Sequence, residues 1–472
     1  MNYPSTAGMP VNEFTTEGYI ALAFPVLFPT GKGDYLQARP VPISRDKYFK
    51  YLMHYEDGRF AKDPRFRYFA MNTILRHSAI SKSNIYIKNM NIKGETLQEL
   101  QNRITENRSL LYNIMAYYTT LRSTSAYWHR RSNELTHMVD QLGKATIFFT
   151  LSAADYHWSD LFRLLISEWD IDDLTDNERR QVMHENPIIV GYFFQERAHI
   201  LINNVMVPLF KVKDYWFRFE WQHRGSPRVH GIMYCSDEPQ VDYNKLSNDD
   251  IEILKSYFDK LCYAINPMAL NTDVSVHPSK IRFSDVTSTN YAQDLSNLLN
   301  AFQRHTKCGS HCLRSKNNVY KCRYNFPHDT SNVSMIDDEN GYFTFKPKRN
   351  DQYIQTYNNI ITQVWRANTD CTLILDLKAV ISYIAKYASK AEKTSKSYLD
   401  FLNDLINAKS QDDLARSALT KIIVSCVSER DYSAQKVAHI LMGWPLYSSS
   451  RSFVYVNTNV SDWHKLEVIY FL

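Results

Sequence analysis

The chain has 472 residues, of which 44% are hydrophobic and 22% are charged, and its net charge is +5. This composition is typical of a globular protein of roughly two to four domains, and it excludes extensive disorder and collagen-like repeats. The charge is too small to indicate a nucleic-acid partner by itself. We find no apolar run of about 18 residues and no secretory signal pattern, which predicts an intracellular protein without a membrane span. Seven cysteines in a chain this long favour a reducing compartment, where a cysteine cluster indicates a metal site rather than disulfides.

Hydrophobic periodicity predicts a mainly helical N-terminal region over residues 1–140, with helices at 45–80 and 96–142. In the second of these, Leu97, Leu100 and Ile104 recur at helical spacing. A short apolar, β-prone run at 146–151 predicts a buried strand. Further helices are expected at 155–168 and 187–206, with a polar helix or loop at 177–185.

The clearest local pattern is a β-hairpin between Tyr215 and Cys235, where two β-prone runs flank a turn that contains Gly225. Beyond it we expect a helix at 248–266, a short strand at 342–345, and helices at 377–392, 409–425 and 433–442. No Gly-x-x-x-x-Gly-Lys-Ser/Thr loop and no Gly-x-Gly-x-x-Gly fingerprint occur, so neither ATP hydrolysis nor a dinucleotide cofactor is expected.

The hairpin carries polar residues that alternate along its strands. Because alternate residues of a strand share a face, Arg228 and His230 point the same way, as do Glu220 and Gln222. Two alternate histidines with an oxygen ligand would bind a divalent cation, but only one of the two positions is histidine here. A single histidine on a strand is commonly just packed and hydrogen-bonded, so this interpretation stays open beside the metal site.

A pair of tyrosines four residues apart, Tyr383 and Tyr387, would place both hydroxyls on one face of the helix expected at 377–392. A tyrosine can act as a covalent nucleophile toward phosphorus. Lys386 lies between them and Lys390 follows, and both would attract a phosphate backbone. The alternative is an ordinary amphipathic helix whose tyrosines contact the core.

Cysteine and histidine concentrate in residues 301–327. His305, Cys308, Cys312 and Cys322 have the short spacing that suits a closed zinc site, with His311 as a substitute for His305. Such a zinc ion would hold a small lobe together and would not catalyse a reaction. The alternative is a set of scattered buried thiols.

Several short segments occur in an order that resembles the N-terminal replication-initiator portion of Helitron transposon proteins, which carries a Helitron helicase-like domain. These segments are Phe148–Asp155, Asn186–Pro187, Phe219–Pro227, His277–Pro278, Cys322–Pro327, Ser433–Gln435 and Gly443–Arg451, together with the Cys/His cluster and the two-tyrosine segment.

The resemblance implies an α+β fold with an antiparallel-sheet core of the histidine–hydrophobic–histidine (HUH, Rep-like) endonuclease type and flanking helices. The first part of this core would span residues 141–300, a zinc lobe residues 301–330, and the two-tyrosine helix with the rest of the Rep-like region residues 331–472. It also implies single-stranded DNA as partner, a role in rolling-circle replication, and a nuclear location.

In that family Mg²⁺ or Mn²⁺ polarises the scissile phosphate, and a helix tyrosine attacks it to leave a 5′-phosphotyrosine. By resemblance, Tyr383 and Tyr387 fill the nucleophile positions, with Lys386 in the same catalytic set. His230 fills the second histidine, and Glu220 or Gln222 supplies the third ligand.

The departure from the family pattern is Arg228, which stands where the first histidine is expected. A guanidinium has no lone pair for a metal and stays protonated. This predicts a copy with little or no nicking activity, in which Arg228, with Lys390, contacts phosphate directly. The family's helicase domain does not follow residue 472, which fits a decayed copy but equally an incomplete gene model or a separate helicase gene. A catalytically dead, zinc-stabilised nucleic-acid-binding or protein-interaction module is the alternative.

Overall fold

The computed structural model describes residues 11–89, 94–106, 119–166, 171–221, 225–243, 245–268, 274–309, 312–316, 319–338, 343–376, 415, 420, 424, 427 and 432–454. The helix expected at 377–392 and most of the one expected at 409–425 lie outside these residues.

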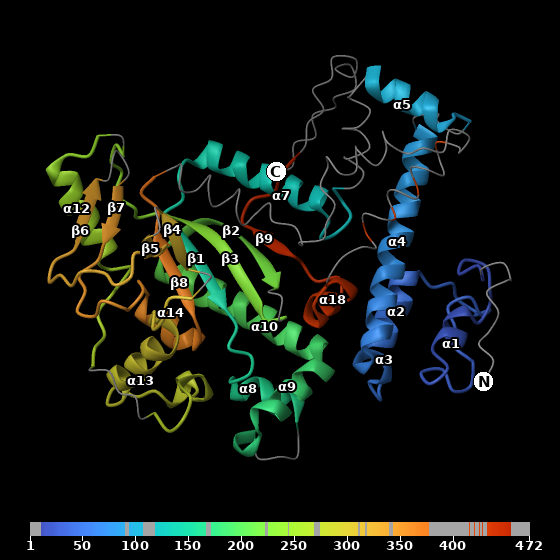
Figure 1. Cartoon of the computed structure of the whole chain (residues 1–472), viewed down its shortest axis with the longest axis horizontal. Coiled ribbons are helices and arrows are strands. Elements are labelled where there is room, and N and C mark those ends of the chain that lie inside the picture. The colour runs from blue at the N-terminus through green and yellow to red at the C-terminus, as the bar shows by residue number, and fades with distance from the viewer. Residues whose placement is uncertain are drawn as a thin grey trace.

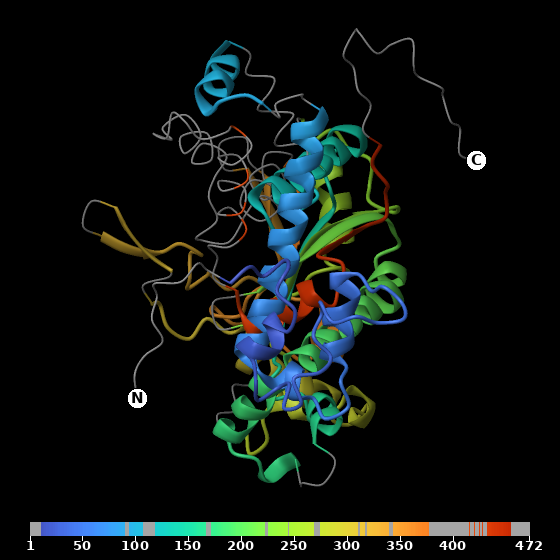
Figure 2. The same cartoon turned by 90° about the vertical axis from the view of Figure 1, so that its right-hand side faces the viewer.

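Helices form most of the described N-terminal part (Figures 1 and 2): α1 Tyr19–Ala23, α2 Arg45–Met53, α3 Arg59–Lys62, α4 Pro64–Asn89 and α5 Leu97–Glu106. The prediction that residues 45–80 are helical is confirmed for most of the stretch, which contains three helices rather than a continuous one. Gly58 adopts φ 70° before α3, a left-handed conformation that suits glycine, and Pro64 begins α4.

A second break divides the helix expected over 96–142. Helix α7 spans Ser125–Leu142, and the side chain of Thr124 caps it by accepting the backbone N–H of Tyr127. Ser123 just before it has φ 66°. A polar cap satisfies an N–H that the first turn leaves unbonded, so the new helix begins at this point.

The centre of the molecule is a five-stranded antiparallel sheet in the order β8-β1-β3-β2-β9. The strands are β1 Ile147–Ser152, β2 Val212–Trp221, β3 Pro227–Cys235, β8 Thr369–Leu373 and β9 Tyr447–Ser449. The predicted buried strand is β1, and the predicted hairpin is β2–β3, so both predictions are confirmed.

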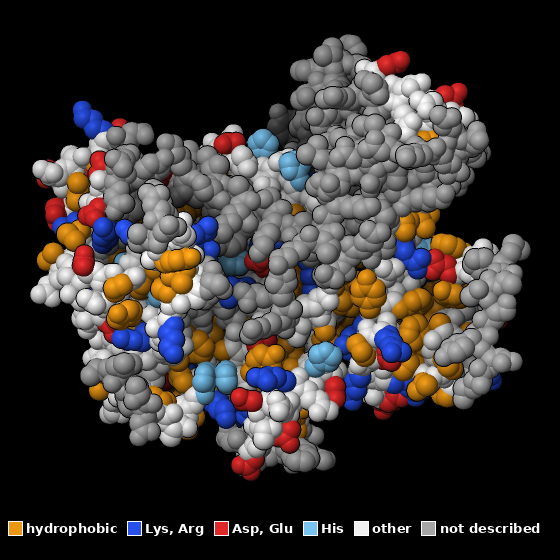
Figure 3. All heavy atoms as spheres, in the orientation of Figure 1, with side chains coloured by type: hydrophobic (Ala, Val, Ile, Leu, Met, Phe, Trp, Pro, Cys, Tyr) orange, Lys and Arg blue, Asp and Glu red, His pale blue; other side chains and the backbone are white. Residues whose placement is uncertain are grey.

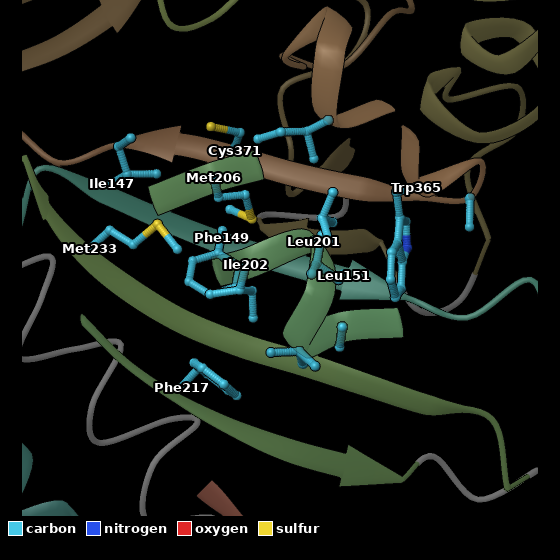
Figure 4. Packing of buried hydrophobic residues seen from close by; sticks show 14 of the residues in the cluster. Ile147, Phe149, Leu151, Leu201, Ile202, Met206, Phe217, Met233, Trp365 and Cys371 are labelled. Carbon is cyan, nitrogen blue, oxygen red and sulfur yellow. The ribbon is translucent and has the colours of Figure 1, made fainter. Parts of the chain in front are cut away.

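Each face of this sheet is covered by a helix. On one face, α10 (Pro187–Leu201) and the π-helical turn Ile202–Met206 pack against apolar residues of β1, β2 and β3 (Figure 4). Leu201, Ile202 and Met206 there lie beside Phe149 and Met233. On the other face, Leu135 and Met138 of α7 pack against strand residues that include Trp216 and Ile232. The sheet is therefore the middle layer of three.

Close packing on the α10 face requires a glycine in β3. A Cβ atom built on Gly231 would lie 2.6 Å from the ring of Phe149 and 2.6 Å from Cβ of Phe217. The two neighbouring strands thus place aromatic groups where only a residue without a side chain fits.

The remaining helices flank this core: α8 Ser159–Leu165, α9 Asp176–Glu185, α11 Val207–Leu209, α12 Asn248–Phe258, α13 Tyr291–Leu298, α14 Asn359–Trp365 and α18 Ala434–Leu441. Two small hairpins complete the described part: β4 Leu313–Lys316 with β5 Val319–Cys322, and β6 Met335–Asp338 with β7 Phe343–Lys346. The helices expected at 155–168 and 248–266 are shorter than predicted.

Helix α18 packs against two separate parts of the fold. Its Val437, Ile440 and Leu441 belong to the same apolar cluster as the N-terminal helices, and it also contacts α10. In Figure 1 it lies between α4 and the sheet. The fold is mixed helix and antiparallel sheet, in agreement with the predicted α+β class. No helix among the described residues is long and apolar enough to cross a membrane.

Candidate functional site

The α7-covered face of the sheet carries a row of polar side chains. The strand register places Asp370 (β8), Thr150 (β1), His230 (β3) and Arg218 (β2) directly beside one another across four strands. Strand residues normally meet an apolar layer on a helix-covered face, so a carboxylate, a hydroxyl, an imidazole and a guanidinium in one row are unusual. Such a row can bind a polar ligand or assist proton transfer.

A second polar row lies two residues further along the strands, where Ser152, Arg228 and Glu220 are in register. Glu220 reaches diagonally to the first row, and its Oε2 lies 2.9 Å from His230 Nε2. The other ring nitrogen of His230, Nδ1, is hydrogen-bonded to Thr150 Oγ1 at 2.9 Å. Protein groups thus contact both nitrogens of this buried imidazole, which is 4% exposed.

Burial lowers the pKa of His230, and the nearby Arg218 and Arg228 lower it further. The hydrogen bond and the negative charge of Glu220 act in the opposite direction but do not reverse the shift. His230 is therefore neutral at pH 7.

A buried lysine completes this environment. Lys436, at the start of α18, is 5% exposed, and burial and the charge of Arg218 hold its pKa well below the ordinary value, while Glu220 acts to raise it. Its Nζ lies 5.7 Å from the ring centroid of Trp221. Arg218 stacks over the ring of Trp128 at 3.6 Å. The site around Glu220 and His230 is therefore rich in cations.

Three of the segments that resemble the family meet at the β2–β3 turn. Ser226 Oγ donates to the buried carboxylate of Asp155, 2.9 Å from Oδ1 and 3.1 Å from Oδ2. Gly225 has φ 92°, and a Cβ atom built on it would lie 2.4 Å from Oε1 of Gln435. The turn is thus held by the loop after β1 on one side and by α18 on the other.

The predicted nucleophiles Tyr383 and Tyr387, with Lys386 and Lys390, lie outside the described residues, as does Gln222. The described chain before them ends after β8, where Ile374 N donates to Thr146 O at 2.9 Å. It resumes before α18, where the ring of His439 lies 4.7 Å from that of Trp221. Both flanks of the tyrosine segment therefore contact the sheet. Whether the tyrosines approach His230 stays a prediction.

The predicted Cys/His cluster converges. Ligand atoms of His305, Cys308, Cys312 and Cys322 all lie within 4.8 Å of one another. His305 Nε2 is 3.2 Å from Cys308 Sγ, 3.6 Å from Cys322 Sγ and 4.0 Å from Cys312 Sγ. One nitrogen and three sulfurs at these separations could hold a metal ion, and this donor set is consistent with structural zinc.

The surrounding chain orients these ligands. The ring of His305 stacks on Phe326 at 4.6 Å, and its backbone N–H donates to Tyr353 O at 2.8 Å. Cys312 and Cys322 flank the β4–β5 hairpin, with Leu313 opposite Cys322 in the register. The short hairpin therefore brings together two cysteines that are ten positions apart. His311, the proposed substitute ligand, lies outside the described residues.

The family model described as "Helitron helicase-like domain at N-terminus" matches residues 48–233. Over these residues the chain is similar to the Helitron helicase-like N-terminal family. No curated protein matches the chain at a significant level. The resemblance predicted from the short segments is thereby confirmed for this part of the chain.

The Helitron helicase-like match begins in α2 and ends in β3. It contains β1, the hairpin, Glu220, Arg228 and His230, and it ends before the Cys/His cluster. The polar rows described above thus lie mainly within the matched stretch, whereas Asp370 and Lys436 lie beyond it.

The residues of this site do not fit the divalent cation that the Helitron resemblance implies. His230 Nε2 and the Glu220 carboxylate are the described donors, and no third His, Cys, Asp or Glu of the described residues joins them in a metal-holding group. Arg228 lies directly across from Glu220, and Arg218 directly across from His230. Two guanidiniums beside two donors disfavour Mg²⁺ or Mn²⁺, because like charges repel at short range.

Sequence reasoning missed four polar residues of this site: Thr150, Arg218, Asp370 and Lys436. Arg218 lies two positions before Glu220 and therefore on the same strand face, so strand alternation could have identified it from the sequence. Asp370 and Lys436 gave no local signal, because only long-range pairing of β8 and packing of α18 bring them near His230.

Proposed function

We propose that this chain is a Helitron Rep-type protein that binds single-stranded DNA and that its own nicking activity is weak or absent. In this proposal Tyr383 and Tyr387 are the family's nucleophiles, and Lys386 and Lys390 contact phosphate. The Rep-like core begins near residue 141, and the protein acts in the nucleus. The family match over 48–233 supports the Rep-type assignment.

The observation that carries the loss of nicking is the position of Arg228. Its strand neighbour in register is Glu220, the carboxylate that also lies 2.9 Å from His230 Nε2. A metal-dependent nuclease needs a cation at such a place to polarise the phosphate. A fixed positive charge can still attract a phosphodiester, which favours binding without cleavage.

DNA binding is supported by the kind of side chains at the surface and in the site. Lys and Arg side chains lie interspersed with apolar ones on the face drawn in Figure 3. Cations attract the phosphate backbone, and aromatic or apolar side chains can accept unstacked bases. The Cys/His cluster, loaded with zinc, would hold the β4–β5 lobe together.

Binding is tested with the full chain and a fluorescent single-stranded oligonucleotide at increasing salt. We expect the logarithm of the binding constant to fall linearly with the logarithm of salt concentration, because bound cations release counterions from DNA. A protein-interaction module without a DNA role would show no binding at low salt, and that result would refute the proposal.

Nicking is tested by incubating the same oligonucleotide with Mn²⁺ and looking for a covalent protein–DNA adduct. The wild-type chain should give little or none. Arg228→His should increase adduct formation, whereas Arg228→Ala, which removes the charge without adding a donor, should not. Adding Tyr383→Phe and Tyr387→Phe to Arg228→His should abolish the adduct. Strong adduct formation by the wild type would contradict the proposed inactivity.

A further inference from the structure

A cavity of about 250 Å³ lies on the α10 side of the sheet, away from the polar rows. Its walls come from the start of α8, from α10, from the end of α14 and from the segment 279–284 (helices labelled in Figure 1). Four cationic side chains line it, Arg197, Lys280, Arg282 and Arg366, against one carboxylate, Asp160.

Two of these charges are neutralised inside the protein. Arg366 pairs with Asp294 at 2.7 Å and also donates to Pro278 O. Arg282 pairs with Asp160 at 2.7 Å, and Arg163 lies 3.6 Å from the same carboxylate. Asp160, the only acidic group that the described residues place on the cavity wall, is thus already engaged by two guanidiniums, which reduces its repulsion of an incoming anion.

The other two cations have no such partner. Among the described residues, no carboxylate forms an ion pair with Arg197 or Lys280. Arg197 packs against two rings, 4.7 Å from Trp158 and 5.6 Å from Trp365. Its Nη2 donates to the carbonyls of Val364 and Trp365, each at 3.1 Å.

One donor of the Arg197 guanidinium remains without a partner among the described residues. Its Nε is buried and has no hydrogen-bond partner in the described part of the chain. The Ser279 hydroxyl, also on the cavity wall, is likewise buried and unbonded there. A buried cation and a buried hydroxyl without partners are costly unless a ligand completes their hydrogen bonds.

We propose that this cavity is a binding site for a phosphate group, held by Arg197 and Lys280 with Ser279 as a further donor. A tetrahedral oxyanion supplies several acceptors, which can receive hydrogen bonds from the Arg197 Nε–H, the Lys280 ammonium and the Ser279 hydroxyl. Phosphate fits the net positive wall and the small volume. The group could belong to a nucleic-acid backbone or to a free phosphate compound, and the site does not depend on the nicking chemistry proposed above.

The test is calorimetric titration of the full chain with inorganic phosphate and with dTMP, at matched ionic strength in chloride. Lys280→Gln and Arg197→Gln should each weaken binding roughly ten- to a hundredfold, the loss expected for one charge-assisted hydrogen bond. Lys260→Gln removes an exposed lysine elsewhere and is the matched control, with unchanged binding. Arg197 packs against two tryptophans, so its variant could fail to fold. The Lys280 ammonium makes no hydrogen bond among the described residues, so Lys280→Gln keeps the test decisive.

A deoxythymidine oligonucleotide without a terminal phosphate identifies the source of the group. Competition between this strand and inorganic phosphate assigns the site to a nucleic-acid backbone. Phosphate binding that the strand does not displace assigns it to a free phosphate compound. The proposal is overturned if the wild type binds neither phosphate nor dTMP, or if Lys280→Gln and Lys260→Gln bind equally well.

Discussion

The hydrogen bond between Ser226 and Asp155 should stabilise the turn just before Arg228. Its contribution should be measurable as a change in the free energy of unfolding when the hydroxyl is removed. The Asp155 carboxylate is 3% exposed and accepts the Ser226 hydroxyl at 2.9 and 3.1 Å. Removing the hydroxyl in Ser226→Ala deletes one hydrogen bond to this buried carboxylate. Hydrogen bonds to charged groups contribute about 1.5–3 kcal/mol, and neutral ones about 0.5–1.5 kcal/mol.

The Asp155 carboxylate is shared among several donors, so we take a value between these limits. Burial raises its pKa, while the Ser226 hydroxyl and the backbone N–H groups of Asp155 and Tyr156 lower it. We therefore expect Ser226→Ala to lower the free energy of unfolding by about 1–2 kcal/mol near pH 7. Asp155→Ala should cost about 2–4 kcal/mol, because it also leaves the backbone N–H groups unbonded.

The assay is urea denaturation followed by tryptophan fluorescence, arranged as a double-mutant cycle. The coupling energy of the pair should be about 1 kcal/mol or more. Ser236→Ala is the matched control, since Ser236 is exposed at the opposite end of the same hairpin and its hydroxyl donates to Lys211 O at 2.9 Å. Its loss should cost less than about 0.5 kcal/mol. Equal effects of the two serine substitutions, or a coupling energy near zero, would show that this reasoning is wrong.

Four further outcomes follow from other parts of the molecule. The purified chain should contain zinc, measured by atomic absorption, and the Cys312→Ser variant should not. A variant that keeps its zinc would contradict the four-ligand site. Burial depresses the pKa of His230 in the folded state, whereas in the unfolded state its pKa is about 6.5. Below about pH 6.5 the unfolded state therefore binds more protons, and the free energy of unfolding should fall as the pH decreases. Glu220→Gln removes the group that raises this pKa and should move the His230 NMR titration to lower pH; an upward shift would contradict the assignment. Gly231→Ala should cost about 1–3 kcal/mol in urea denaturation, since its Cβ would lie 2.6 Å from Phe149 and Phe217, and an unchanged midpoint would contradict this.

Features encoded by neighbouring residues could be predicted from the sequence. The β2–β3 hairpin needs two β-prone runs and a turn with Gly225, all within about twenty positions. The Cys/His cluster needs only short spacings and one tight hairpin to bring Cys312 and Cys322 together. In both cases the chain has few ways to arrange the residues, so composition and spacing were sufficient.

Features that depend on distant contacts could not be predicted in this way. Periodicity continued through Gly58 and Thr124, and the sequence alone did not indicate that a left-handed residue or a side-chain cap would end one helix and start another. The edge strands β8 and β9 are short, and they are extended because they pair with β1 and β2. Lys436 is about two hundred positions from Glu220, and only the packing of α18 brings its charge near that carboxylate.

The replacement at position 228 changes the chemistry of the site more than its shape. Strand parity keeps residue 228 on the face of His230, and the register keeps it opposite Glu220, whichever side chain it carries. A histidine there would place a second neutral nitrogen donor beside the His230–Glu220 pair. Arginine instead adds a permanent charge and no donor. The fold of the hairpin can therefore persist after the metal site is lost, and a single substitution back to histidine is a fair test of whether catalysis was lost at this position alone.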